Sequence, residues 1–267
     1  MPRRHLIELH EQSWYPAFLR RLFQRGLGRS LTLTGAFDHF VEPFADFVRR
    51  TGTREILDLC SGSGDAAGSV WNAISPRLDD GQSVKLVLSD LFPNREAYDR
   101  LRQAHPATLD FIPESVNALS PPAGTPRVRT IFNAFHHFRP EQARAILADA
   151  AAHADGIAVF EVTRNHWTNM LQTLVVLPVA SAFLTTFLLR PVSWQQVVFG
   201  LFVPIIPFTA VFDGVVSNLR TYGEEDLREM TRGLGDGGFR WEIGRVPVGS
   251  TGLQATYLFG WRESEPS

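Results

Sequence analysis

The stretch "ILDLCSGSGDAAG", residues 56–68, decides the fold class. Its first residues are apolar and lead to an acid, Asp58, which is typical of a short buried strand. Gly62 and Gly64 follow, and a helical pattern begins at about Asp65. Glycine lets a backbone approach a ligand closely, and the start of a helix offers free N–H groups. The stretch therefore predicts a strand, a ligand-binding turn and a helix.

Strand and helix patterns alternate on the C-terminal side of this turn. The expected strands are 55–60, 84–90, 109–116, 128–135 and 156–162. Such alternation is typical of a parallel sheet with helices on both faces. Two further strands, "RWEIGRVPVG" and "QATYLFGWRE", are separated by a glycine-rich turn and predict an antiparallel hairpin. We therefore expect an α/β fold with a Rossmann-like, seven-stranded, mostly parallel sheet and an antiparallel C-terminal hairpin.

Three parts are expected along the chain. Residues 1–50 have helical spacing and predict an N-terminal helical cap. Residues 51–165 and 221–267 form the expected core, and residues 166–220 a hydrophobic helical insertion after the fifth strand.

Composition narrows the classes of function. The 267 residues are 44% hydrophobic and 20% charged, as in globular proteins, and the net charge of −2 gives no sign of nucleic-acid binding. The basic run "RRLFQRGLGR" (20–29) is interpreted as a solvated helix face. Cys60 is the single cysteine, which excludes an internal disulfide and favours a reducing compartment. The first residues lack the apolar core of a signal peptide, so we expect a cytoplasmic protein.

Polar residues follow the second and third strands. Asp90 ends the second strand, where a carboxylate can accept hydrogen bonds from both hydroxyls of a ribose. Val116 and Asn117 follow the third strand and suit the edge of an adenine. A dinucleotide fingerprint would have a third glycine where Ala67 stands, which leaves a nicotinamide enzyme as an alternative that is not favoured.

These residues resemble those of class I S-adenosylmethionine-dependent methyltransferases. The resemblance rests on "DLCSGSGD" (58–65), Asp90, Asn117, the closing hairpin and "AFHHF" (134–138), and is greatest to small-molecule enzymes such as the quinone C-methylating group. It covers nearly the whole chain except the first forty residues and the insertion. Asn117 departs from the more usual Asp. The resemblance implies S-adenosylmethionine as cofactor, held by Asp58, Cys60, Ser61, Gly62, Ser63, Gly64, Asp90, Leu91, Val116, Asn117 and Asn133.

Three residues are candidates for catalysis. Methyl transfer needs alignment, and a base only when the acceptor must lose a proton. His136 and His137 follow the fourth strand and are candidate bases, or else cap the strand or contact the cofactor. Glu161, at the end of the fifth strand, either orients the acceptor or pairs with Arg220. We expect no metal, because adjacent histidines diverge in an extended backbone and no spaced third ligand is evident.

Five residues are candidates for the substrate site. Asp213, Arg220 and Tyr222 follow an apolar run and suggest a polar lip over the site, or else an ordinary helix end with a salt bridge. Trp14 and Tyr15 suggest an aromatic wall, or else a contact that pins an N-terminal helix to the core.

The apolar segment 171–212, divided at Arg190-Pro191, is interpreted as a helical lid over a small, hydrophobic or aromatic acceptor. Its prolines and glutamines disfavour spanning helices. Three alternatives stay open for the segment: a transmembrane hairpin, shallow membrane attachment to reach a lipid-like substrate, and the face of a homodimer. The sequence thus predicts methyl transfer to a small molecule. A membrane scaffold that binds S-adenosylmethionine without catalysis is the rival from another class.

Overall fold

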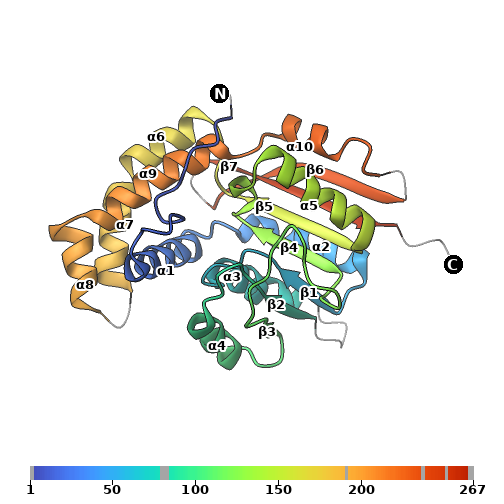
Figure 1. Cartoon of the computed structure of the whole chain (residues 1–267), viewed down its shortest axis with the longest axis horizontal. Helices are drawn as coiled ribbons and strands as arrows, with labels where there is room; N and C mark the ends of the chain where they lie inside the picture. Colours follow the sequence, from blue (N-terminus) through green and yellow to red (C-terminus); the bar gives the residue numbers. More distant parts are fainter. Residues whose placement is uncertain (1–2, 79–83, 190–191, 236–237, 250–251, 264–267) are drawn as a thin grey trace.

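The computed structural model describes residues 3–78, 84–189, 192–235, 238–249 and 252–263. Its centre is a seven-stranded sheet in the order β3-β2-β1-β4-β5-β7-β6 (Figure 1). The first five strands in this order are parallel, and β7 pairs antiparallel with both β5 and β6. The predicted fold class is confirmed. The strands are β1 Glu55–Asp58, β2 Lys85–Leu88, β3 Leu109–Phe111, β4 Val128–Phe132, β5 Gly156–Glu161, β6 Phe239–Pro247 and β7 Gln254–Arg262.

The parallel strands end earlier than their apolar patterns predicted. Every residue of β4 and β5 is buried, as expected for the two strands at the centre of a covered sheet. Cys60 has φ 60° and Asn133 has φ 51°, and such left-handed backbone cannot continue a strand. The chain therefore turns sharply just beyond β1 and β4. These turns lie at the carboxyl edge of the sheet, where open α/β sheets bind their ligands.

Helices cover both faces of the sheet. The buried apolar side chains of α2, α3 and α4 pack with those on one face, and the side chains of α5 and α10 pack on the other. Each face has its own buried cluster, so the core lies in two layers around the strands. The helices are α1 Ala17–Leu33, α2 Val41–Thr51, α3 Asp65–Ile74, α4 Arg95–Ala104, α5 Pro140–His153, α6 Trp167–Val175, α7 Leu177–Phe183, α8 Trp194–Val197, α9 Ile205–Arg220 and α10 Glu224–Thr231.

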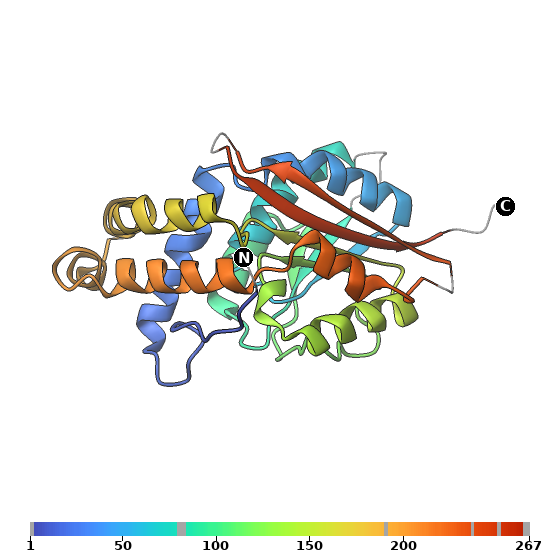
Figure 2. The same cartoon turned by 90° about the horizontal axis from the view of Figure 1, so that it is seen from above.

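Residues 167–189 and 192–220 form a helical arm that projects beyond the carboxyl edge of the sheet (Figures 1 and 2). α6 and α7 pack along α9, and α1 of the N-terminal cap packs against α7 and α9. Among the described helices, none is by itself long and apolar enough to cross a bilayer. Two pairs reach that length and hydropathy only together, with bends of 45° (167–175 and 177–187) and 64° (194–202 and 205–220). The expected division at Arg190-Pro191 lies outside the described residues.

Candidate functional site

The glycine turn, residues 59–64, connects β1 to α3 and is open on one side. Gly62 has φ 57°, and a Cβ added there would meet nothing within 4 Å. Gly64 has φ 77°, but a Cβ there would come within 2.8 Å of side-chain carbons of Leu88 and Leu101. The two glycines thus have different roles. Gly64 lets the turn pack on the core, whereas Gly62 leaves space that a ligand can enter.

Asp90 joins the end of β2 to the glycine turn. Its Oδ2 accepts from the backbone N–H of Gly62 at 2.9 Å, and its Oδ1 accepts from that of Phe92 at 2.8 Å. A carboxylate oxygen can accept a second hydrogen bond, so both oxygens keep capacity for a ligand. Beside it, Leu91 is exposed, and Phe92 exposes 82% of its surface. Phe92 was not among the predicted residues, although an apolar pair after the acid was a readable signal.

Asp58 is fully buried and braces the turn. Ser61 Oγ donates to one of its oxygens at 2.5 Å, and Thr130 Oγ1 of β4 donates to the other at 2.7 Å. Burial raises the pKa of Asp58 to about 7, although both hydroxyl hydrogen bonds oppose that rise. The half-buried Cys60 packs beside the cluster that contains α5. Ser63 Oγ donates to Asp65 at 2.8 Å. These side chains shape the turn.

The remaining predicted cofactor residues lie along the same edge. Val116 is buried, and its N–H donates to the carbonyl of Asp90 at 2.9 Å. Asn117 is exposed, and its Oδ1 accepts from the N–H of Leu119 at 3.0 Å. Asn133 sits at the end of β4, where its Oδ1 accepts from the N–H of Val162 at 3.1 Å. The edge therefore brings together the ends of β1, β2 and β4 with the loop after β3.

A cavity of about 310 Å³ lies between this edge and the arm. Its walls come from α1, α6, α7 and α9, and they are mostly apolar. The loops after β4 and β5 line it as well, through Asn133, His136, His137, Val162 and Thr163. The cavity thus joins an apolar chamber in the arm to polar groups at the carboxyl edge of the sheet.

His136 and Glu161 form a buried pair at that edge. His136 Nδ1 lies 2.6 Å from Glu161 Oε2, and the N–H of His136 donates to Glu161 Oε1 at 3.1 Å. Burial works against charge on both groups, but each attracts the other's charged form. The balance raises the pKa of His136 above its usual value and lowers the pKa of Glu161. The partner of Glu161 is thus His136 rather than Arg220, the salt-bridge partner that the sequence suggested.

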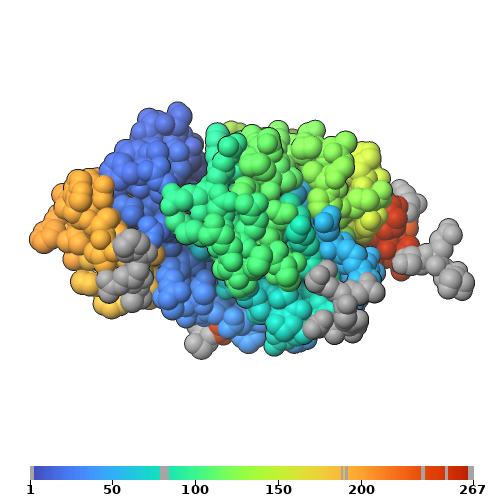
Figure 3. Space-filling view, turned by 90° about the horizontal axis from the view of Figure 1, so that it is seen from below, coloured from blue at the N-terminus to red at the C-terminus, as the bar shows by residue number. Residues whose placement is uncertain are grey.

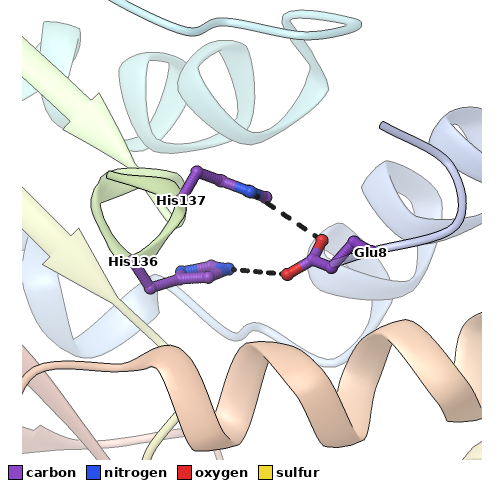
Figure 4. A group of neighbouring side chains, drawn as sticks. All are labelled: Glu8, His136 and His137. Atoms are coloured by element: carbon purple, nitrogen blue, oxygen red, sulfur yellow. Dashed lines mark ion pairs between the residues drawn. The ribbon is translucent and has the colours of Figure 1, made fainter. Parts of the chain in front are cut away.

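The N-terminal strap, residues 3–15, supplies acids that the sequence did not single out. Glu8 is 1% exposed and lies 3.7 Å from His136 Nε2 and 3.8 Å from His137 Nδ1 (Figure 4). Arg220 Nη1 lies 3.3 Å from Glu8 and donates to Glu11 at 3.0 Å. Glu11 also contacts His137 Nδ1, and this lowers the pKa of Glu11 despite its burial.

This cluster removes both grounds on which no metal was expected. His136 and His137 lie in a 3₁₀ turn, Phe135–His137, with ring centroids 4.3 Å apart, so their side chains do not diverge. Glu8 supplies a third ligand type within reach of both. However, His137 Nδ1 already contacts Glu11, and the Arg220 guanidinium already lies 3.3 Å from Glu8. The absence of a metal therefore stays a prediction.

The predicted substrate residues are separated by the fold. Asp213 lines the cavity, where it accepts from the N–H groups of Leu9 at 2.6 Å and His10 at 3.1 Å. Arg220 and Tyr222 are buried, and Arg220 donates to the carbonyl of His137 at 2.7 Å. They form the inner support of the β4 loop instead of a polar lip, because the strap covers them.

The two N-terminal aromatic residues lie away from the cavity wall. Trp14 is 66% exposed. Tyr15 is buried, and its hydroxyl hydrogen-bonds Thr209 Oγ1 at 2.8 Å, which pins the strap to α9. This is the structural contact that the sequence offered as the alternative to an aromatic wall.

No protein-family model matches the sequence, and no curated protein matches it either. Solved structures do match. The plantazolicin methyltransferase BpumL, in complex with SAH, aligns at 12% identity with a TM-score of 0.60, over 95% of this chain and 94% of that one. A putative O-methyltransferase of Nostoc punctiforme aligns at 14% identity with a TM-score of 0.52, over 93% of this chain and 61% of that one.

An O-methyltransferase family protein of Burkholderia thailandensis aligns at 18% identity with a TM-score of 0.46. That alignment covers 88% of this chain, which spans 59% of the length of the Burkholderia protein. The first two matches, together with the strand order, establish the architecture. The chain has the Rossmann-like fold of class I S-adenosylmethionine-dependent methyltransferases.

Proposed function

We propose that the protein transfers a methyl group from S-adenosylmethionine to a small, mainly apolar acceptor. One observation supports this most strongly. The open glycine turn and Asp90 lie on the same sheet edge as an apolar cavity whose polar end holds the His136–Glu161 pair. A buried histidine held by a carboxylate at the end of a cavity is an arrangement suited to a general base.

The residues at the glycine turn fit the cofactor. The open side of Gly62 suits the methionine part, and the spare acceptor capacity of Asp90 suits the two hydroxyls of a ribose. The exposed Leu91 and Phe92 offer an apolar surface for an adenine, and the Leu91 carbonyl accepts from Ser115 of the loop that also holds Asn117. When bound, S-adenosylmethionine would supply a methyl group to which a nucleophile can form a bond, while the methyl–sulfur bond breaks and the sulfur leaves as the thioether of S-adenosylhomocysteine.

His136 is the residue that we propose removes the proton of the acceptor. Glu161 accepts from Nδ1, which leaves Nε2 to take a proton from the acceptor's hydroxyl or amine. The Glu161 carboxylate then stabilises the imidazolium that forms. The cavity, at about 310 Å³, is at the small end of the range of ligand pockets and is mostly apolar. These features favour an aromatic or aliphatic acceptor with one ionisable group.

Calorimetry with S-adenosylhomocysteine, the product form of the cofactor, tests the proposal. The wild type should bind one equivalent, and Asp90→Ala should lose roughly 10²-fold or more in affinity, because two charge-assisted hydrogen bonds contribute about 1.5–3 kcal/mol each. Asp110→Ala is the matched control, since Asp110 forms a surface ion pair with Lys85. Equal affinity in the wild type and Asp90→Ala would remove Asp90 from the site.

A further inference from the structure

The outer surface of the arm is unusually apolar. Trp194, Phe202 and Phe208 expose 67%, 76% and 63% of their surface, and many neighbours are also exposed. Across the described residues 167–189 and 192–212, the sequence has no Asp, Glu, Lys or Arg. Scattered apolar residues are normal on a protein surface, but a continuous uncharged stretch of this length marks an interaction surface. The other exposed members are Trp167, Leu171, Leu174, Val175, Val176, Val179, Phe183, Phe187, Val192, Leu201, Val203 and Phe212.

A basic helix lies directly beside this surface. α1 packs against α7 and α9, and Figure 3 shows the N-terminal region next to the arm. Arg21 and Arg29 of α1 are exposed, and no acid occurs in the sequence between Glu11 and Asp38. An apolar surface beside a helix with exposed arginines is complementary to an anionic bilayer, whose acyl region takes the apolar side chains and whose headgroups attract the basic ones.

The geometry favours attachment at the bilayer surface. Each apolar helix of the arm is too short to span a bilayer, and the two longer pairs are bent by 45° and 64°. Exposed tryptophans such as Trp167 and Trp194 prefer the membrane–water interface. A second copy of the chain is a poorer occupant, because the same surface of the partner has no Asp or Glu in residues 167–189 and 192–212 to pair with the arginines of α1.

The same helices connect this surface to the cavity. α6, α7 and α9 expose apolar side chains outward, and other residues of these helices, including Leu177 and Ile206, line the cavity. We propose that the apolar part of the arm, residues 167–189 and 192–212, docks with α1 on an anionic lipid bilayer, and that the acceptor is a membrane-resident apolar molecule that enters the cavity through the arm. The choice of acceptor rests on the proposed function, whereas bilayer docking does not.

Sedimentation of the full chain with lipid vesicles tests the docking. The protein should sediment with phosphatidylcholine–phosphatidylglycerol vesicles, more weakly with pure phosphatidylcholine, and less as salt rises. The triple variant Trp194→Ser, Phe202→Ser, Phe208→Ser should bind anionic vesicles at least about tenfold more weakly, as expected when three large apolar side chains no longer enter the acyl region. The double variant Arg21→Gln, Arg29→Gln should bind anionic vesicles more weakly than the wild type, by roughly fivefold for each charge removed.

Controls separate docking from folding and from the proposed function. Arg100→Gln removes an exposed arginine of α4 and should leave vesicle binding unchanged. Every variant should keep the S-adenosylhomocysteine affinity of the wild type, which reports folding independently of lipid. Unchanged vesicle binding in the triple variant would overturn the proposal. So would a stable dimer in solution that the triple variant dissociates, because the surface would then belong to a second copy.

Discussion

The two halves of the site are built in different ways on one sheet edge. On the cofactor side, contacts join the ends of neighbouring strands, as between Gly62 and Asp90, which are 28 residues apart. On the acceptor side, His136 and Glu161 also lie at the ends of neighbouring strands, 25 residues apart, but the strap is held by contacts between segments about 200 residues apart, as between Leu9 and Asp213. The first half therefore follows from the core fold alone. The second half also depends on the N-terminal strap folding back over the arm. Substitutions in one half should therefore leave the properties of the other half unchanged.

The largest difference between the effect on turnover and the effect on cofactor-site affinity is expected for His136→Ala. If His136 takes the acceptor's proton, turnover should fall about 10²–10⁴-fold while the affinity for S-adenosylhomocysteine stays within about twofold of the wild type. His137→Ala should cost much less, because the ring of His137 contacts Glu11, whereas the ring of His136 contacts Glu161. Full turnover in His136→Ala would show that the acceptor needs no base from this loop.

Asp213→Asn should loosen the strap without affecting the glycine turn. Asp213 also lies 2.8 Å from His10 Nδ1, so the change removes charge from three hydrogen bonds to residues 9 and 10. At roughly 1–3 kcal/mol, local opening should become about 5–150-fold more frequent. Limited proteolysis should then cleave the strap faster by a similar factor. Asp46→Asn, on the exposed face of α2, serves as the control. Equal rates of cleavage of the strap in Asp213→Asn and Asp46→Asn would contradict the claim that Asp213 holds the strap in place.

Glu161→Gln should shift the pH dependence of turnover. The Glu161 carboxylate holds the pKa of His136 above its usual value, so the unprotonated base should accumulate only as pH rises through that raised pKa. Without the carboxylate, burial dominates and the pKa of His136 falls. The rate profile should therefore move to lower pH, with a maximum reduced by about tenfold or more. An unchanged pH–rate profile in Glu161→Gln would show that Glu161 does not set the pKa of the catalytic base.

Asp58→Asn is expected to have the smallest effect of these substitutions. The property that should change is the stability of the fold. The carboxyl keeps its proton up to about pH 7 in the folded chain, but loses it near pH 4 when unfolded. Unfolding therefore releases a proton between these values, and stability should fall as pH rises through that window. At pH 8 the variant should melt at least about 2–4 °C higher than the wild type. Identical melting curves from pH 4 to 8 would show that Asp58 is ionised throughout.

The cofactor half could be predicted because its signals are local. Glycine at 62 and 64, an acid at the end of the second strand and alternating patterns are readable along the chain. Even there the strand ends were placed too late, since the positive φ at Cys60 and Asn133 has no sequence signature. In an open parallel α/β sheet, the carboxyl ends of the strands lie at one edge and bind the ligand there, so the predicted residues could be placed together.

The acceptor half could not be assembled from sequence in the same way. Glu8 and Glu11 lie in a segment without helical or strand periodicity, and their partners His137 and Arg220 come from a loop and a helix end far along the chain. For Glu161 the sequence offered either a contact with the acceptor or a salt bridge to Arg220, whereas the fold pairs Glu161 with His136. Long-range pairing of charges depends on packing that no local pattern encodes.

Hydrogen exchange with and without S-adenosylhomocysteine tests the division of the site most directly. The ligand should protect the glycine turn, residues 59–64, together with the segments 89–92 and 116–118. The strap, residues 3–15, and the arm helices α6 and α7 should exchange at nearly unchanged rates. Protection confined to the strap and the arm, with the glycine turn unaffected, would contradict the assignment of the cofactor to the edge formed by β1 and β2.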